Sequence, residues 1–143
     1  MEFEGRVWKE GKFWLIEVPA LDVMTQGMTK KEALHMVQDA TTGLVECYFK
    51  SQMGKNFSVI ANDYGKGMIT VTSNDTKLLL ALSLRRQREK SQSTVREASE
   101  RLGSKSPNAY AQYEKGRMNI SLDKYEQLLM AANPLERRHL RIA

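Results

Sequence analysis

The periodicity of the apolar residues changes once along the chain, and this change restricts the possible folds more than any other feature. Up to Ser73, apolar residues mostly alternate with polar ones, except in one helix-like stretch that begins after Thr29. From Thr76 onward they recur every three or four residues, and no strand pattern remains. The sequence therefore predicts an α+β chain in two parts, residues 1–75 and residues 76–143.

For residues 1–75, the sequence predicts five strands around a single helix. The strands are expected at 2–8, 13–18, 23–26, 57–61 and 68–72, with a turn-rich link at 62–67. Thr29 and Glu32 form a capping-box pattern, and the helix behind it is expected to run to about Gln52. Its apolar stripe is expected on Ala33, Val37, Ala40, Leu44 and Cys47. The order β-β-β-α-β-β predicts one helix on one face of a small sheet.

The second expected strand carries apolar residues on both of its sides. Ile16 points one way, but Phe13 and Leu15 on the other side are also apolar, and Glu17 shares their side. A sheet that is apolar on both faces needs a second cover. That cover could be another subunit, a partner protein or the C-terminal part. We favour an intermolecular contact, because the C-terminal part looks self-contained.

For residues 76–143, the sequence predicts four or five short helices. They are expected at 76–90, 94–102, 106–115 and 121–132. Thr94, Ser106 and Ser121 are suited to begin the last three of these helices, because their hydroxyls can accept backbone N–H groups. Gly103 and Gly116 are suited to end two of them, because glycine readily adopts the left-handed conformation. The result is a compact all-helical module.

Charge is divided unequally between the two parts. Residues 1–76 contain 8 Lys and Arg against 10 Asp and Glu, whereas residues 77–143 contain 14 against 7. Such asymmetry suggests two modules with different partners, and the basic module is a candidate for binding a polyanion such as nucleic acid. A basic helical face can equally be solvated without a partner, so charge alone leaves both interpretations open.

Composition excludes several classes of protein. Cys47 is the only cysteine, so an internal disulfide is excluded and a reducing compartment fits. The longest apolar run, residues 78–82, is far shorter than the roughly 20 residues that span a bilayer. The first residues show no signal-peptide pattern. We therefore expect a soluble cytoplasmic protein with no membrane partner.

No catalytic or metal-binding constellation is evident. His35 and His139 have no Cys or carboxylate at a metal-ligand or triad spacing. Cys47 has no base partner and is expected to be an inert buried thiol. We therefore expect no enzymatic activity, no metal and no cofactor. A metal-dependent nuclease is the least favoured alternative, and it would require activity with added Mg²⁺ that depends on a strand carboxylate.

Residues 93–132 have the proportions of a helix-turn-helix. The segment STVREASERLGSKSPNAYAQYEKGRMNISLDKYEQLLMAA, together with Arg88, resembles the lambda-repressor-like (Xre-type) family. The matching positions are Arg88, Ser99, Leu102-Gly103, residues 113–117 and Ile120-Ser121-Leu122. Two positions depart from that family: the span from Gly103 to Glu114 is one residue longer, and Gln92 replaces the common Gly.

This resemblance implies specific roles for individual residues. Arg88 and Glu114 would form a structural ion pair between helices, and Tyr110 and Tyr113 would belong to the core. The outward recognition positions are Pro107, Asn108, Ala111 and Gln112, of which Asn and Gln suit adenine. The remaining DNA contacts, mainly to phosphates, would come from Thr94, Lys105, Ser106, Lys115 and Arg117. The expected partner of this part is double-stranded operator DNA.

The segment FWLIEVPALDVMTQGMTKKEALHMVQDATTGLVECYF resembles the HicB family of antitoxins, at Val18-Pro19, Gln26-Gly27, Thr29 and 32–34. That family has a partial RNase H-like fold, and the loop at 20–23 is one residue shorter here. The resemblance implies an antitoxin that neutralises a HicA-type mRNA interferase, represses its own operon and forms a homodimer or homotetramer. Phe13, Leu15 and Glu17 are the candidate face for the toxin or for self-association.

The alternative is an Xre-type transcriptional regulator whose N-terminal domain senses a ligand or only dimerises. A neighbouring reading frame for a small toxin would distinguish the antitoxin from this regulator.

Overall fold

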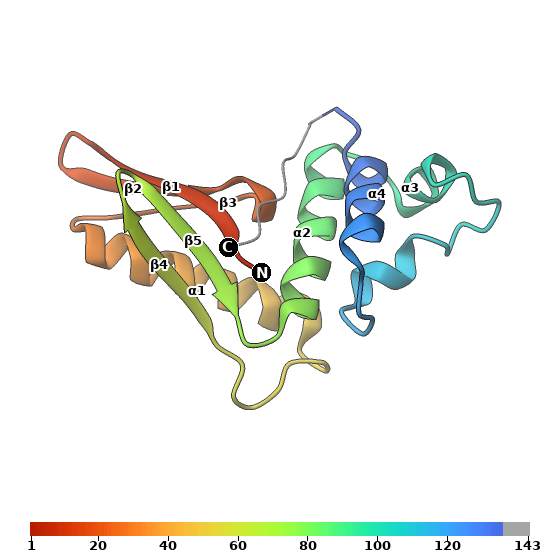
Figure 1. Ribbon diagram of the computed structural model, residues 1–143, viewed down its shortest axis with the longest axis horizontal. Coiled ribbons are helices and arrows are strands. Elements are labelled where there is room, and N and C mark those ends of the chain that lie inside the picture. Colours follow the sequence, from red (N-terminus) through yellow and green to blue (C-terminus); the bar gives the residue numbers. More distant parts are fainter. Residues whose placement is uncertain (136–143) are drawn as a thin grey trace.

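The computed structural model describes residues 1–135 and has the predicted α+β order (Figure 1). His139 lies outside the described residues. The elements are β1 (Phe3–Glu10), β2 (Phe13–Val18), the 3-10 helix η1 (Pro19–Leu21), β3 (Val23–Gly27), α1 (Lys30–Phe49), β4 (Val59–Gly65), β5 (Met68–Ser73), α2 (Thr76–Lys90), α3 (Val95–Arg101), the 3-10 helix η2 (Ala111–Lys115) and α4 (Leu122–Ala132).

The five strands form one antiparallel sheet in the order β3-β2-β1-β5-β4. Helix α1 packs against one face of this sheet and contacts both β3 and β4, so it crosses from one edge strand to the other (Figure 1). This crossing places β4 at the edge opposite β3, and β5 then returns beside β1. One of the two hydrogen bonds of the predicted capping box is present at the start of α1: the Glu32 N–H donates to the Thr29 hydroxyl at 3.0 Å.

Strand β4 is longer than the sequence indicates. It runs to Gly65, so residues 62–65 belong to the ladder and not to a link. The reason is a tight turn at Lys66 and Gly67, whose φ angles of 55° and 78° match the twist of a hairpin. A register shift between Asp63 and Gly65 precedes this turn, and the Asp63 carboxylate accepts the Gly65 N–H at 2.9 Å.

The buried face of α1 also differs from the predicted stripe. Its buried residues recur every four positions: Ala33, Val37, Thr41, Val45 and Phe49. Ala40 and Leu44 flank this row and are half-buried, because residues four apart advance about 40° around the helix and the buried row therefore winds away from their side. Cys47 is exposed, so the expectation of a buried thiol is wrong.

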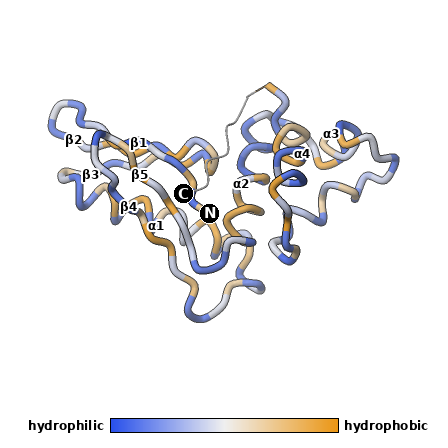
Figure 2. Tube along the Cα trace, in the orientation of Figure 1, coloured by the Kyte–Doolittle hydropathy of each residue, from blue (hydrophilic) through white to orange (hydrophobic). Residues whose placement is uncertain are grey.

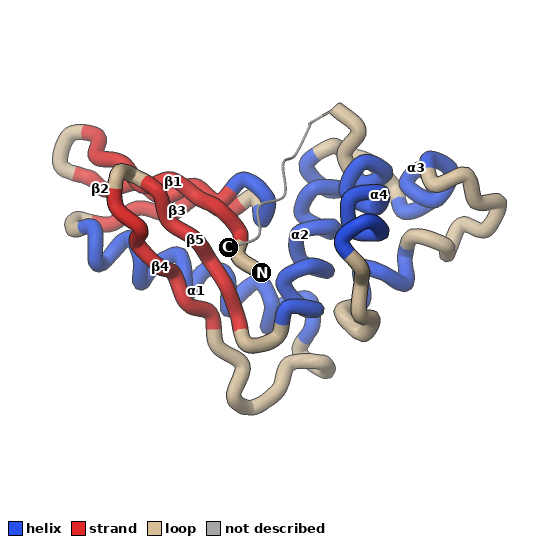
Figure 3. Tube along the Cα trace, in the orientation of Figure 1, coloured by secondary structure: helices blue, strands red, loops and turns tan. Residues whose placement is uncertain are grey.

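The face of the sheet away from α1 remains open among the described residues. Phe13 and Leu15 are half-buried there, and Glu17 is exposed. They are paired across the ladder with Glu10, Trp8 and Arg6 of β1. Figure 3 shows the C-terminal helices beside the sheet and not over this face.

Helix α2 joins the two parts of the chain. It contacts α1, β5 and η1 on one side, and α4 and η2 on the other. Residues 78–84 and Gln87 are all buried, and the apolar ones belong to a single hydrophobic core that continues from the sheet into α4. Figure 2 shows this apolar stretch of α2 between the two parts. The C-terminal part is therefore not self-contained, since its first helix also completes the core of the sheet.

Polar contacts reinforce the same junction. The fully buried Gln87 donates its amide N–H groups to the carbonyls of Pro19 and Ala20 at 2.8 and 3.1 Å. Its side-chain oxygen accepts from Asn133 at 3.1 Å, just beyond α4. Arg86 donates to the carbonyls of Leu21 and Asp22. Together with the Asp22 N–H, which donates to the Pro19 carbonyl at 3.1 Å, these donors pair the carbonyls at the end of η1.

Gly116 gives a direct test of this packing. It has a φ of 72°, and an added Cβ would lie 2.8 Å from Leu78 Cδ2 and 3.3 Å from Phe49 Cδ1. We expect Gly116→Ala to lower the free energy of unfolding by about 2–4 kcal/mol, through left-handed strain and overpacking. Gly103→Ala is the matched control: its φ is 79° with nothing within 4 Å of the added Cβ. It should cost about 1–2 kcal/mol. Equal losses in urea unfolding would contradict the close packing at Gly116.

Candidate nucleic-acid interface

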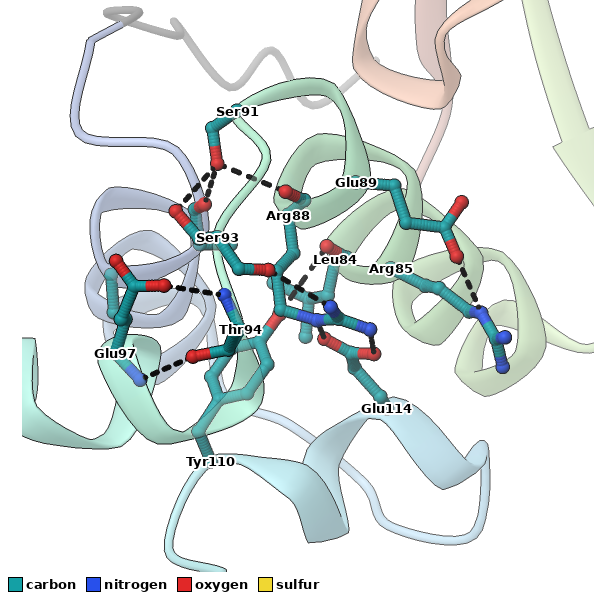
Figure 4. A network of polar contacts seen from close by, with 12 residues as sticks. Leu84, Arg85, Arg88, Glu89, Ser91, Ser93, Thr94, Glu97, Tyr110 and Glu114 are labelled. Carbon is teal, nitrogen blue, oxygen red and sulfur yellow. Dashed lines mark hydrogen bonds and ion pairs between the residues drawn. The ribbon is translucent and has the colours of Figure 1, made fainter. Parts of the chain in front are cut away.

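The turn into α3 is held by a complete capping box. The Thr94 hydroxyl accepts the Glu97 N–H, and the Glu97 carboxylate accepts the Thr94 N–H, both at 3.1 Å (Figure 4). The hydrogen bond from the Thr94 N–H to the carboxylate is the main cause that lowers the pKa of Glu97. Gln92, where the Xre-type pattern commonly has Gly, adopts the left-handed conformation with a φ of 58°. Thr94 is exposed, but the Glu97 carboxylate already occupies the end of α3 that was expected to meet a phosphate.

The predicted third helix over 106–115 is wrong as an α-helix. The structure has turns at 107–110, followed by η2 (Figure 3). Two serine hydroxyls bind backbone N–H groups at the start of this segment. The Ser104 hydroxyl accepts the Ser106 N–H at 3.2 Å, and the Ser106 hydroxyl accepts the Asn108 N–H at 3.3 Å.

A third hydroxyl, from α3, reaches into the same segment. Ser99 is buried; it donates to the Pro107 carbonyl at 3.0 Å and accepts the Tyr110 N–H at 3.1 Å. An α-helix would instead pair the Pro107 carbonyl with the N–H four residues later. Ser99 therefore fixes the segment as a turn that leads into η2.

Two aromatic residues attach this segment to the core, in line with the family resemblance. Tyr110 is fully buried, and its hydroxyl donates to the Leu84 carbonyl of α2 at 3.3 Å. Burial raises the pKa of Tyr110 far above its usual value, so the hydroxyl stays protonated and remains a donor. Tyr113 is half-buried, with the Lys124 ammonium 5.3 Å from its ring centre. Between these tyrosines, Gln112 is exposed and Ala111 is half-buried.

Arg88 and Glu114 form a bidentate ion pair (Figure 4). Arg88 Nε donates to one Glu114 oxygen at 2.7 Å and Nη2 to the other at 3.0 Å. A further N–H of Arg88 donates to the Ser93 carbonyl at 3.0 Å. The Arg88 side chain is 16% exposed and that of Glu114 is 8% exposed, and the pair raises the pKa of Arg88. It ties α2 to both the α2–α3 turn and η2.

The candidate DNA-contacting residues lie mostly at the surface. The exposed ones are Thr94, Lys105, Ser106, Pro107, Asn108, Gln112, Lys115 and Arg117, while Ala111 is half-buried. Gln112 makes one long hydrogen bond, from Nε2 to the Ala109 carbonyl at 3.4 Å, which a better acceptor could replace. Apart from Thr94, which caps α3, the predicted positions lie on one segment, 105–117, that is supported by Ser99, Tyr110 and Glu114.

One basic residue was missed by sequence reasoning. A small hollow of about 170 Å³ lies between α3 and the turn at 104–107, and Arg96 and Lys105 both line it. Glu100 lines the same hollow and offsets part of their charge. The position of Arg96, two residues after the Thr94 cap, was the available signal, because the first turn of this helix faces the following loop.

Other side chains form no comparable site. Among residues 1–135, no group of three or more His, Cys, Asp or Glu is arranged to hold a metal ion. His35 lies 3.3 Å from Asp39, and both side chains are mostly exposed. Within the same described range, no helix is long and apolar enough to cross a membrane.

Comparison with known proteins supports the helical part. Residues 83–133 match the family model for helix-turn-helix domains, a range that begins inside α2 and ends just after α4. No curated protein and no solved structure matches the chain. Residues 83–133 thus form a helix-turn-helix domain, and this match supports a role in DNA binding and transcriptional regulation.

The Arg88–Glu114 pair generates a stability prediction. We expect Glu114→Ala to lower the free energy of unfolding by about 3–5 kcal/mol, because a mostly buried Arg88 would lose its charge partner. The matched control is Glu89→Ala, which removes the exposed partner of Arg85 on the same helix. That change should cost about 0–1 kcal/mol. Chemical denaturation of the full chain measures both, and a negligible effect of Glu114→Ala would show that the pair does not hold the helices together.

Proposed function

We propose that this protein is a sequence-specific DNA-binding repressor that acts by binding and not by catalysis. The observation that carries the proposal is the segment at 105–117, which is anchored by buried Tyr110 and Glu114 and exposes amide and cationic side chains inside a helix-turn-helix domain. In such domains the segment after the turn enters the major groove. We place this activity in the cytoplasm, at the promoter of the protein's own operon.

The two kinds of exposed side chain have different tasks in this proposal. Asn108 and Gln112 can each form two hydrogen bonds to the N6 and N7 edge of adenine, so they read sequence. Lys105, Lys115 and Arg117 contact phosphates, which supplies affinity and fixes the register without reading bases. The Ser99 hydroxyl and the serine turns hold the segment in one conformation, so the amides are preorganised for binding.

Replacement of Gln112 tests base reading. We expect Gln112→Ala in the full chain to weaken binding to a selected operator by about 1–3 kcal/mol and to relax preference at one base pair. Lys115→Ala is the control, and it should weaken operator and random DNA alike and reduce the salt dependence. Titration of fluorescent duplexes at several salt concentrations measures both effects. An equal loss on operator and random DNA for Gln112→Ala would remove its base-reading role.

We further infer that the open face of the sheet binds a partner protein, a HicA-type toxin, and that the chain is its antitoxin. A hollow of about 640 Å³ lies on this face, where apolar Trp8 and Met68 adjoin Glu4 and Glu17. Phe13 and Leu15 continue the apolar surface along β2. Apolar anchors beside carboxylates are suited to a basic protein surface. The HicB-like motifs in the first 49 residues support the same interpretation.

The competing proposal is a regulator whose sheet domain senses a small ligand or only dimerises. The same hollow could hold a ligand, since it contains both Arg6 and Lys66. Copurification from the native host distinguishes the two proposals: the antitoxin carries a small basic protein, and the ligand sensor does not. In either case we propose a homodimer or homotetramer, because helix-turn-helix proteins commonly bind two-fold related half-sites.

Two substitutions on the open face test the antitoxin role. We expect the full chain carrying Phe13→Asp and Leu15→Asp to lose protection of cells from the toxin, because burial of one such apolar side chain is worth about 1.5–3 kcal/mol. Glu17→Lys, at an exposed position, should weaken toxin binding with little effect on folding. The control is Met130→Asp, an apolar-to-acidic change on α4 where Met130 is 65% exposed. Full protection by the folded double variant would show that this face is not the toxin site.

A further inference from the structure

The two edge strands of the sheet are protected to different degrees. On β4, the Ala61 N–H donates to the Gln38 side-chain oxygen of α1 at 2.9 Å, so an outward backbone group is already paired. The register shift at Asp63 and Gly65 bends the same strand, and Asp63 is also held by Lys30 at 2.7 Å. Bulges, charges and side-chain caps of this kind prevent an edge from pairing with another strand.

Strand β3 has none of these protections. Its sequence, Val-Met-Thr-Gln-Gly, contains no charged side chain, and its five residues pair with β2 without a register shift. Within residues 1–135, the only hydrogen bond that β3 makes outside the sheet comes from the Thr25 hydroxyl, which donates to the Ala33 carbonyl. Its outward backbone groups are therefore open to a further strand.

Exposed methionines surround this edge. Met24 on β3 is 59% exposed, and Met28 just after the strand is 52% exposed. Met36 on α1 is 43% exposed. Gln38, two residues later, contacts β4 through its side chain. Two residues correspond to a rotation of about 200° around the helix, so Met36 and Gln38 lie on roughly opposite sides of α1. Met36 is thus on the side of α1 that faces β3. Flexible methionines of this kind fill irregular interfaces well.

We propose that β3 pairs antiparallel with β3 of a second copy of this chain. A two-fold axis at Thr25 would set Met24 opposite the partner's Gln26, and the two sheets would become one continuous sheet. A second copy fits because β3 carries no charged residue, so pairing two copies of β3 brings no like charges together. A basic toxin strand fits less well, since β3 offers no carboxylate. The need for a two-fold dimer rests on the proposed DNA-binding function.

This arrangement leaves the open face of the sheet free. Met24 and Gln26 lie on that face, opposite Glu17 and Leu15 of β2 in the ladder. Pairing through the edge would extend the face across both copies and would not cover it. Self-association and binding of a partner protein would therefore use adjoining surfaces, so that one dimer presents two partner sites.

A charge exchange across the expected two-fold axis tests the proposal. In Met24→Lys/Gln26→Lys, each pair across the axis would consist of two cations. In Met24→Lys/Gln26→Glu, each pair would be of opposite charge. We expect the wild-type full chain to be a dimer at micromolar concentration. The dissociation constant of the like-charged variant should exceed that of the opposite-charged variant by about tenfold, since cross-strand charge pairs contribute about 0.2–1 kcal/mol each.

Analytical ultracentrifugation without DNA or toxin measures these constants, and thermal melts confirm that the variants fold. A monomeric wild-type chain overturns the proposal, even if an added peptide or toxin then occupies the edge. Equal dissociation constants for the two variants overturn it as well, because the dimer contact would then lie elsewhere. An equal loss of affinity for operator and random DNA in Gln112→Ala would instead count against the proposed base reading, and the ultracentrifugation result does not depend on that measurement.

Discussion

The burial of α2 on two opposite sides is the constraint on which the rest of the structure depends. An amphipathic helix usually buries one stripe, but α2 buries residues 78–84 without interruption because the sheet and α4 lie on different sides of it. The contact with α1 includes the Arg85 guanidinium, 4.1 Å from the ring centre of Tyr48. Gln87 satisfies backbone carbonyls on one side and Asn133 on the other. The first helix of the DNA-binding unit is therefore also a structural element of the sheet domain.

This arrangement connects the position of the segment at 105–117, for which we propose a DNA contact, to the rest of the molecule. The segment depends on α2 through the Tyr110 hydroxyl and the Arg88–Glu114 pair, and on α3 through Ser99. Gly116, at the end of η2, approaches Phe49 of α1. A partner bound to the sheet that moved α1 or η1 would meet resistance from these contacts, so a rigid connection is the simplest route by which the sheet domain could influence DNA binding.

Local patterns were sufficient to predict much of the fold, whereas tertiary contacts decided the rest. Hydrophobic alternation, the Thr29 cap and the serine and threonine caps located the strands and the regular helices within a few residues. The prediction of a third α-helix failed because Ser99, eight residues before Pro107, binds the Pro107 carbonyl, and no local sequence pattern reveals this contact. The buried role of Gln87 was equally hidden, because its partners Pro19 and Asn133 are distant in sequence. The Arg88–Glu114 contact was expected only from the family resemblance.

Native-state hydrogen exchange of the full chain tests this structural role of α2 most directly. If α2 joins both parts into one core, the slowest amides of β1, β5, α2 and α4 should exchange through the same global opening, with one free energy and one denaturant dependence. A contradictory result would be a partial opening in which α4 exchanges at a clearly lower free energy while β1 and β5 remain protected. The two parts would then be independent units that share only a covalent connection.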